Sequence, residues 1–271
     1  MNLTTLLKNP EFVSILRGYL SQIFVQTTLQ SINAQVLVNA RKLVRSNDNL
    51  TDPLCLTDPL LPKEAMFLGT LLQIYLMRKY NLSNFKSSLA YRTLSKQFDC
   101  SDFLEACTNI KSEFHICFTI GSYLEKIRAG LPVLPNGLFG AYSINYSIKL
   151  QNLFILIAGQ LDNPVLSALQ GTELNKVFRA PNNFNADCFA ASHDTIWQTK
   201  TSFKFGQYFT EYDFNKALVY SMLSLFENKE SGKIMLISTL TNDVFCLNFW
   251  DYIKTDKKDL LLATNNILAL V

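Results

Sequence analysis

The chain contains 271 residues with a formal net charge of +3, and 48% of its residues are hydrophobic while 17% are charged. This composition excludes a disordered protein, which lacks the apolar area needed to offset the entropy lost on folding, and the length suits one large domain or two modest ones. The longest apolar run, residues 65–77, is shorter than the about 20 residues that span a bilayer, so the sequence predicts no membrane segment.

The first 50 residues predict two amphipathic helices. An Asn-Pro-Glu triplet at 9–11 is typical of a helix start, and apolar residues then recur at helical spacing over 12–24. A second helix is expected at 32–44, with one apolar face. The opposite face of this second helix carries three cations, which are Arg41, Lys42 and Arg45.

The next part of the chain is predicted to be a proline-punctuated loop followed by helices. The loop covers 51–65, and Pro62 opens a helix that runs to about Tyr80 and is broken at 81–83. Further helices are expected at 85–98 and from Ser101 into the 120s.

Residues 130–140 are the part of the chain richest in glycine and proline, which predicts a boundary between two regions, 1–133 and 134–271. The two regions can still pack together as one domain. Residues 142–150 alternate between apolar and polar side chains, which predicts a strand. The apolar run at 153–158 predicts a buried strand or a continuation of the first.

The rest of the second region mixes both kinds of secondary structure. In chain order we expect a helix start at Asn163-Pro164, an irregular loop at 175–200, a strand at 202–209, a helix capped by Thr210 and Asp213, a hairpin of 233–240 with 244–250, and a short C-terminal helix. The sequence therefore predicts an α+β fold: a predominantly helical N-terminal region, then a smaller mixed region with a few strands and a hairpin.

Few residues are suited to catalysis or to metal binding. The chain has two histidines, and its six cysteines are scattered without the close spacing of a zinc site. It has neither of the glycine-rich motifs that bind nucleotide phosphates. The N-terminus lacks the basic and apolar pattern of an export signal. We expect reduced cysteines, no metal, no cofactor and an intracellular, cytoplasmic protein.

Two sets of residues offer an alternative to this expectation. Cys188, His193 and Asp194 lie close together in sequence and are the basis of an alternative hypothesis, a hydrolase with a cysteine nucleophile. A nuclease of the Asp…Glu-x-Lys type needs an acid on one strand and Glu-x-Lys on the next. The nearest Glu-x-Lys is 227–229, which follows an expected helix and is better explained as a turn.

The segment 75–98 interleaves cations with aromatic residues, and it lies within an acid-free run from 65 to 98. Residues 1–100 contain 11 Lys and Arg against 6 Asp and Glu, whereas residues 101–271 contain 14 against 16, so the positive charge is concentrated in the first third. Cations bind phosphates, and exposed aromatic rings stack on unpaired bases.

We therefore expect a non-enzymatic subunit of a larger nucleoprotein assembly that binds RNA or single-stranded DNA, with other protein subunits as partners. The expected phosphate contacts are Arg41, Lys42, Arg45, Arg78, Lys79, Lys86, Arg92 and Lys96, and the expected stacking residues are Tyr80 and Tyr91. A structural or protein-interaction subunit without nucleic-acid contact is the other alternative, since it fits the scarcity of catalytic residues equally well.

Overall fold

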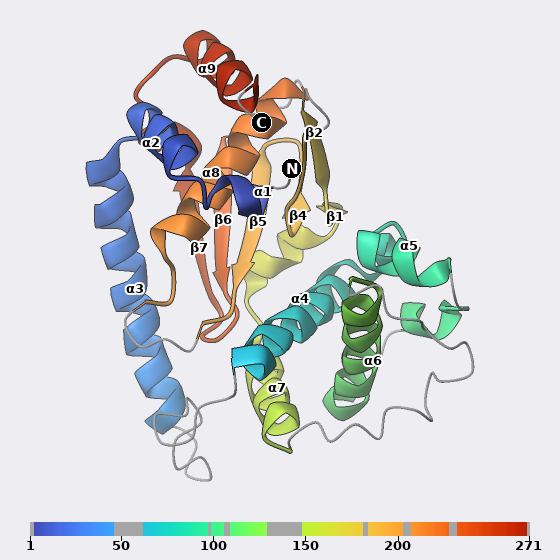
Figure 1. Cartoon of the computed structure of the whole chain (residues 1–271). Coiled ribbons are helices and arrows are strands. Elements are labelled where there is room, and N and C mark those ends of the chain that lie inside the picture. Colours follow the sequence, from blue (N-terminus) through green and yellow to red (C-terminus); the bar gives the residue numbers. More distant parts are fainter. Residues whose placement is uncertain are drawn as a thin grey trace.

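A computed structural model shows an α+β protein in which helices pack around a mixed β-sheet (Figure 1). The expected fold class is confirmed. The structure describes residues 3–45, 62–96, 99–105, 109–128, 148–180, 184–202, 207–227 and 232–269.

The N-terminal segment forms α1 (Leu3–Leu6), α2 (Pro10–Tyr19) and α3 (Gln22–Arg45). Asn9 caps α2 as predicted, because its side-chain oxygen accepts from the backbone N–H of Glu11 at 2.9 Å. The single helix expected to reach residue 24 is wrong, because the backbone at 19–21 bonds to residues near the C-terminus. The Ser21 N–H donates to the Tyr252 carbonyl at 2.9 Å, so the chain breaks there before α3 begins.

A helical layer follows, made of α4 (Pro62–Phe85), α5 (Leu89–Ser95), α6 (Ile110–Arg128) and α7 (Ile148–Gln160), with a 3-10 turn η1 (Ser101–Leu104). The helix start at Pro62 is confirmed, and so is the break at Asn81, which has φ −146° and ψ 44°. The helix expected at 85–98 is shorter, because Ser88 caps α5 and its side chain accepts from the Tyr91 N–H at 3.1 Å. The helix expected from Ser101 instead starts at Ile110.

The strand expected at 153–158 is wrong, because these residues belong to α7. Leu153, Phe154, Ile157 and Ala158 are buried, since α7 packs against both α4 and α6. A helix covered on two sides is apolar nearly all round, so its sequence resembles that of a buried strand. Most of the alternating stretch at 142–150 lies outside the described residues, and its last three residues begin α7.

The main sheet has the strand order β1 (Glu173–Leu174), β4 (Ala190–Ala191), β5 (Thr195–Lys200), β6 (Lys233–Ser238) and β7 (Asp243–Asn248). β2 (Val177–Ala180) pairs with β3 (Phe184–Asp187) as a separate ribbon. The loop expected at 175–200 is therefore wrong, since short strands there pair with one another. The expected hairpin is confirmed by the antiparallel pairing of β6 with β7.

The helix α8 (Glu211–Phe226) connects β5 to β6, which run parallel. Its predicted cap is confirmed, because the Thr210 and Asp213 side chains each accept from the other's backbone N–H. Of the strand expected at 202–209, residues 203–206 lie outside the described ranges, and residues 207–209 are not a strand. Asn163 caps the 3-10 helix η3 (Pro164–Leu169), which lies between α7 and β1. After β7 come the 3-10 helix η5 (Phe249–Tyr252) and the predicted C-terminal helix, α9 (Lys257–Ala269).

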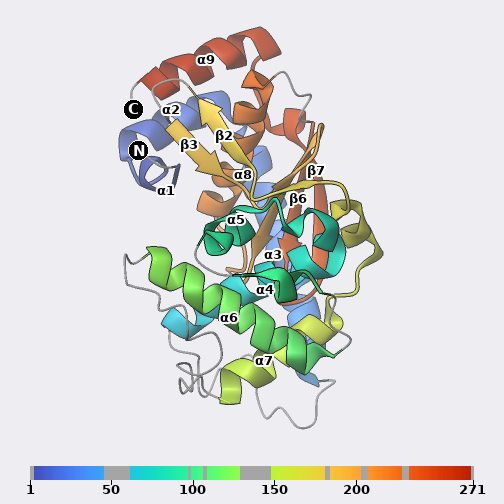
Figure 2. The ribbon, with the colours of Figure 1, turned by 90° about the vertical axis from the view of Figure 1, so that its right-hand side faces the viewer.

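Opposite faces of the sheet are covered by different helices. The Gln73 side chain of α4 donates to Thr199 at 2.6 Å, whereas the next residue, Lys200, pairs with Asp213 of α8 at 2.7 Å. Neighbouring residues of a strand point to opposite faces, so α4 lies on one face and α8 on the other. In Figure 2 the layer of α4 to α7 lies below the sheet and its ribbon of β2 and β3.

Packing crosses the position where a boundary was expected. That position, between residues 133 and 134, lies outside the described residues. The helices on its two sides, α6 and α7, contact each other, and α2 and α3 contact α9 and α8. Within the described ranges, no helix combines the length and apolar character needed to cross a membrane.

Candidate nucleic-acid interface

Arg78, the first cation of the segment 75–98, is 3% exposed and holds three parts of the helical layer together. Its Nε and Nη2 atoms donate to the two carboxylate oxygens of Glu113 in α6, both at 3.0 Å. The guanidinium also donates to the Phe103 carbonyl, and to the Glu105 carbonyl at 2.8 Å. These contacts occupy the guanidinium inside the protein, so Arg78 does not offer it to a phosphate.

Lys79 and Tyr80 both donate to the backbone carbonyl of Leu161, where α7 ends. The Lys79 Nζ lies 2.6 Å from that oxygen and the Tyr80 hydroxyl lies 2.8 Å from it. The Lys79 Nζ also lies 3.5 Å from the Asp162 carboxylate. Burial raises the pKa of Tyr80, and the Asp162 charge adds to the effect. Both side chains therefore fasten α4 to α7.

The aromatic rings of the segment are used for packing. Tyr91 is 9% exposed, and its ring meets that of Phe85 edge-on at 6.1 Å. Tyr75 is 8% exposed and packs edge-on against Phe154. Burial, with a further contribution from the Glu113 carboxylate, raises the pKa of Tyr75 to about 12. A ring enclosed in this way cannot stack on a base, so Tyr91 does not provide the expected platform.

Arg92 of α5 and Lys96, the residue that caps the end of this helix, have a different environment. Both are exposed, one helical turn apart, and line a cavity of about 560 Å³. Lys176 lies on the other side of this cavity, with Glu173 and Glu227. The Lys176 amine contacts these two carboxylates at 3.2 and 3.1 Å. Burial acts to lower the pKa of Lys176, but the bonds to both carboxylates outweigh it, so the pKa is raised. Among the described residues, the Arg92 and Lys96 side chains have no acidic partner.

The remaining predicted cations do not join this cavity. Lys86 lies exposed in the turn between α4 and α5. Arg41 and Lys42 are exposed on α3, and the Arg45 side chain lies outside the described part of the chain. In Figure 1, α3 forms the left edge of the molecule while α5 lies at the right, so the two basic helices do not form one surface.

Several polar side chains lie together at the end of β5. The sequence does not predict this cluster, because β5 falls within the segment 175–200 that was expected to be a loop. The Lys200 amine contacts Asp213 Oδ1 at 2.7 Å, and Asp213 Oδ2 accepts from the Thr210 hydroxyl at 2.7 Å. The Gln198 Oε1 atom is buried and has no hydrogen-bond partner within the described residues. Gln198 and Lys200 are two apart on β5, so they share a face of the sheet. The strand β3 ends at Asp187, just before β4, the neighbour of β5.

The three residues of the alternative hydrolase do not form an accessible nucleophilic site. Cys188 is 2% exposed, and its thiol donates to the Ala190 carbonyl at 3.3 Å. Asp194 accepts from the Thr195 hydroxyl at 2.8 Å and contacts the Lys233 amine at 3.3 Å. Its pKa is lowered chiefly by the Thr195 bond. A buried thiol cannot meet a substrate, so these three residues do not support a hydrolase.

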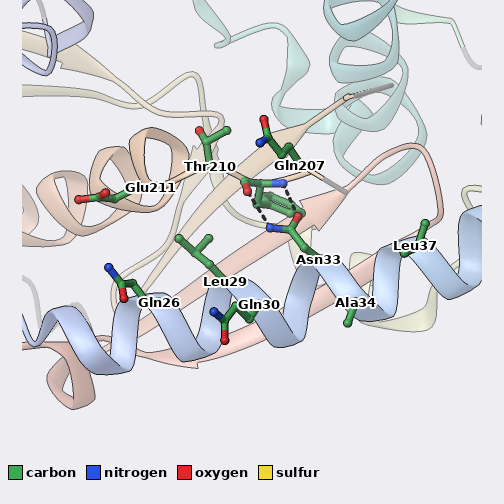
Figure 3. A pocket seen from close by; sticks show the side chains of 10 residues that line it. Gln26, Leu29, Gln30, Asn33, Ala34, Leu37, Gln207, Thr210 and Glu211 are labelled. Carbon is green, nitrogen blue, oxygen red and sulfur yellow. Dashed lines mark hydrogen bonds between the residues drawn. The ribbon is translucent and has the colours of Figure 1, made fainter. Parts of the chain in front are cut away.

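A second cavity of about 560 Å³ lies between α3 and the start of α8 (Figure 3). Asn33 fixes one wall, because its amide donates to the Phe209 carbonyl at 2.9 Å and accepts from the Phe209 N–H at 2.8 Å. Three exposed amide side chains also line the cavity, which are Gln26, Gln30 and Gln207.

Comparisons with protein-family models, with curated proteins and with solved structures found no match for the chain. Among the described side chains, no three His, Cys, Asp or Glu residues come together as metal ligands.

Proposed function

We propose that the protein binds RNA or single-stranded DNA through α5, as a subunit of a larger cytoplasmic nucleoprotein assembly with other protein partners. The observation that carries the proposal is the pair Arg92 and Lys96, which lines a cavity of about 560 Å³ without an acidic partner among the described residues. Two like charges one turn apart repel each other by about 0.2–0.5 kcal/mol, and a bound phosphate chain relieves that repulsion.

The proposed interface contains fewer residues than the sequence predicts. Its cations contact the phosphate backbone rather than the bases. Arg92, Lys96 and the exposed Lys86 supply the cations, whereas Arg78 and Tyr91 are buried. Contacts of this kind bind phosphates without distinguishing sequence. Lys176 contributes less to phosphate binding, because its charge is already neutralised by ion pairs with Glu173 and Glu227.

The test is binding of fluorescently labelled 12-nucleotide RNA and DNA between 50 and 200 mM salt. We expect Arg92→Glu with Lys96→Glu to weaken binding more than tenfold at 50 mM. The slope of log affinity against log salt should fall by about 1.4, because each phosphate contact on a single strand contributes about 0.7. RNA and DNA of one sequence, compared directly, show whether the 2′-hydroxyl matters.

A matched control is Lys257→Glu with Lys258→Glu, since these two exposed lysines of α9 give the same change in net charge at another place. If both double variants weaken binding equally, the effect is one of net charge and the α5 site is wrong. If the unaltered protein binds no oligonucleotide at 50 mM salt, the nucleic-acid function is wrong, and the role of a protein-interaction subunit is favoured.

A second candidate function is hydrolysis of a phosphodiester bond at the end of β5. The observation that favours it is Gln198-Thr199-Lys200 on β5, which follows the acid that ends β3, Asp187. This is the Asp…Glu-x-Lys pattern with Gln in place of Glu. The unpartnered Gln198 oxygen fits an oxygen-preferring cation such as Mg²⁺, which is commonly held by one or two carboxylates together with substrate phosphates. Lys200 completes the spacing of the pattern, and its amine is paired with Asp213 at 2.7 Å.

The two candidate functions differ in a cleavage assay. With Mg²⁺ or Mn²⁺, a hydrolase should shorten a labelled oligonucleotide, and Asp187→Asn or Gln198→Ala should abolish the cleavage while the protein stays folded. Asp194→Asn is the control, because Asp194 contacts Thr195 and Lys233 instead. An intact oligonucleotide with both metals would leave binding without catalysis as the function.

A further inference from the structure

The cavity between α3 and the start of α8 has the features of a site for one neutral, planar group. Its volume is about 560 Å³, and Leu29, Ala34 and Leu37 give it apolar surface. Glu211 contributes little net charge, because its two carboxylate oxygens accept from Arg17 at 2.9 and 3.0 Å. Such a cavity suits an uncharged ring better than a phosphate.

The polar groups of this cavity are amides with unused hydrogen-bonding capacity. Gln26 and Gln30 extend from α3, and Gln207 lies across the cavity from them (Figure 3). Their side chains have no hydrogen-bond partner within the described ranges. An amide offers a donor and an acceptor side by side, which is the pattern that the N6 and N7 atoms of adenine complement.

The walls of the cavity are held in place before any ligand binds. The reciprocal bonds between the Asn33 amide and the Phe209 backbone fix α3 to the segment that carries Gln207. The same segment leads into the cap of α8, where Asp213 accepts from the Thr210 N–H at 2.9 Å. A preformed site loses less entropy when it binds a ligand, so a small planar group is enough to fill it.

We propose that this cavity binds an unpaired adenine base of the nucleic acid, with Gln30 and Gln207 contacting its edge. This inference rests on the proposed nucleic-acid function and adds base preference to it. The cavity adjoins the start of α8, whereas Glu227, which lines the α5 cavity, follows the end of that helix.

The direct test uses the four free nucleosides with the whole protein, followed by saturation-transfer NMR. Adenosine should give a signal that Gln30→Ala and Gln207→Ala each reduce at least fivefold, and guanosine, cytidine and uridine should give weaker signals. Gln160→Ala, at an exposed position on α7, is the matched control and should leave the adenosine signal unchanged. Equal signals from all four nucleosides, or an adenosine signal indifferent to both cavity variants, would overturn the inference.

A second measurement separates this inference from the proposed function. The ratio of the affinities for oligo(dA) and oligo(dC) of 12 nucleotides should be about 5 or more, and Gln30→Ala with Gln207→Ala should bring it to about 1 without changing the salt slope. Charge reversal at Arg92 and Lys96 should lower the salt slope and leave the affinity ratio unchanged.

Oligonucleotides bound with equal affinity disprove the base site alone, whereas adenosine bound without any oligonucleotide binding disproves the proposed function alone. Because Gln30 and Gln207 are exposed and unpartnered in the described structure, their substitution should not unfold the protein.

Discussion

Arg78 and Arg92 belong to one acid-free segment of the chain, but their environments differ. Arg78 of α4 is buried in an ion pair, whereas Arg92 of α5 is exposed and lines a cavity. The difference comes from position on the helix. Arg78 lies on the side of α4 that meets α6, where Glu113 is available, whereas Arg92 follows the buried Tyr91 and lies on the outer side of α5. Residue type and local composition are the same in both cases, so only packing separates a structural cation from a binding one.

The largest expected effect is on folding stability, at Arg78. Arg78→Met leaves the Glu113 carboxylate buried without its partner, and we expect a loss of about 3–5 kcal/mol in the free energy of unfolding, measured by urea denaturation. Arg92→Met is the matched control and should change stability by less than about 0.5 kcal/mol. Adding Glu113→Leu to Arg78→Met should recover much of the loss. Equal losses for Arg78→Met and Arg92→Met would remove the distinction between the two arginines.

A smaller loss is expected at Asn81, where α4 breaks. The Asn81 amide donates to the Leu169 carbonyl at 2.6 Å and to the Thr172 carbonyl at 2.9 Å, and both contacts are buried. Asn81→Ala should lower the free energy of unfolding by about 1–3 kcal/mol, because it removes two buried hydrogen bonds. Asn84→Ala removes a longer, partly exposed contact to Thr172 and should have less effect in the same urea titration. A greater loss at Asn84 would contradict the role of Asn81.

Stability at high pH tests the burial of Tyr75. Its pKa is about 12 in the folded protein against an ordinary value of 10.0, so its neutral form is favoured on folding. The stabilisation is complete below pH 10 and is lost as the pH rises towards 12, because the unfolded chain ionises first. We expect the free energy of unfolding to fall by about 1 kcal/mol between pH 9 and pH 11 because of Tyr75. The fall should be smaller in the Tyr75→Phe variant. Identical pH profiles for the two proteins from pH 9 to 12 would show that Tyr75 does not contribute.

The smallest effect is expected at the exposed pair on α5. Lys96→Ala removes the repulsion between Lys96 and Arg92, so the free energy of unfolding should rise by about 0.2–0.5 kcal/mol at low salt. The gain should vanish in 1 M salt, where charges are screened within about 3 Å. A precise thermal unfolding series in low and high salt measures it. A marked loss of stability would indicate that Lys96, like Arg78, has a structural partner.

Local signals in the sequence predicted several elements correctly. Asn9, Pro62, and the pair Thr210 and Asp213 mark helix starts through contacts with their own neighbours in the chain, and the structure contains all of these starts. The hairpin of β6 and β7 is also local, since a short turn joins two runs of strand-forming residues. Such interactions need no information about the rest of the fold.

Errors occurred where distant contacts decide the outcome. The apolar residues of α7 are buried by α4 and α6, which periodicity within 153–158 cannot show. The strands between 173 and 200 are short, and they form because they pair with each other and because β5 pairs with β6, across α8. That misassignment also hid Gln198 and Lys200, whose spacing on a strand has meaning only once the strand is recognised.

The sequence by itself determined the α+β class, the local helix starts and the concentration of positive charge in the first third of the chain, because composition and neighbouring residues set these properties. Only the tertiary structure decided which cations are free. An arginine is neutralised by an acid far away in sequence, as Arg78 is by Glu113, and an aromatic ring is enclosed by whichever helix packs over it. Burial and pairing depend on the three-dimensional arrangement of the chain, and for that reason Arg92 and Lys96 could be separated from Arg78 only in the folded protein.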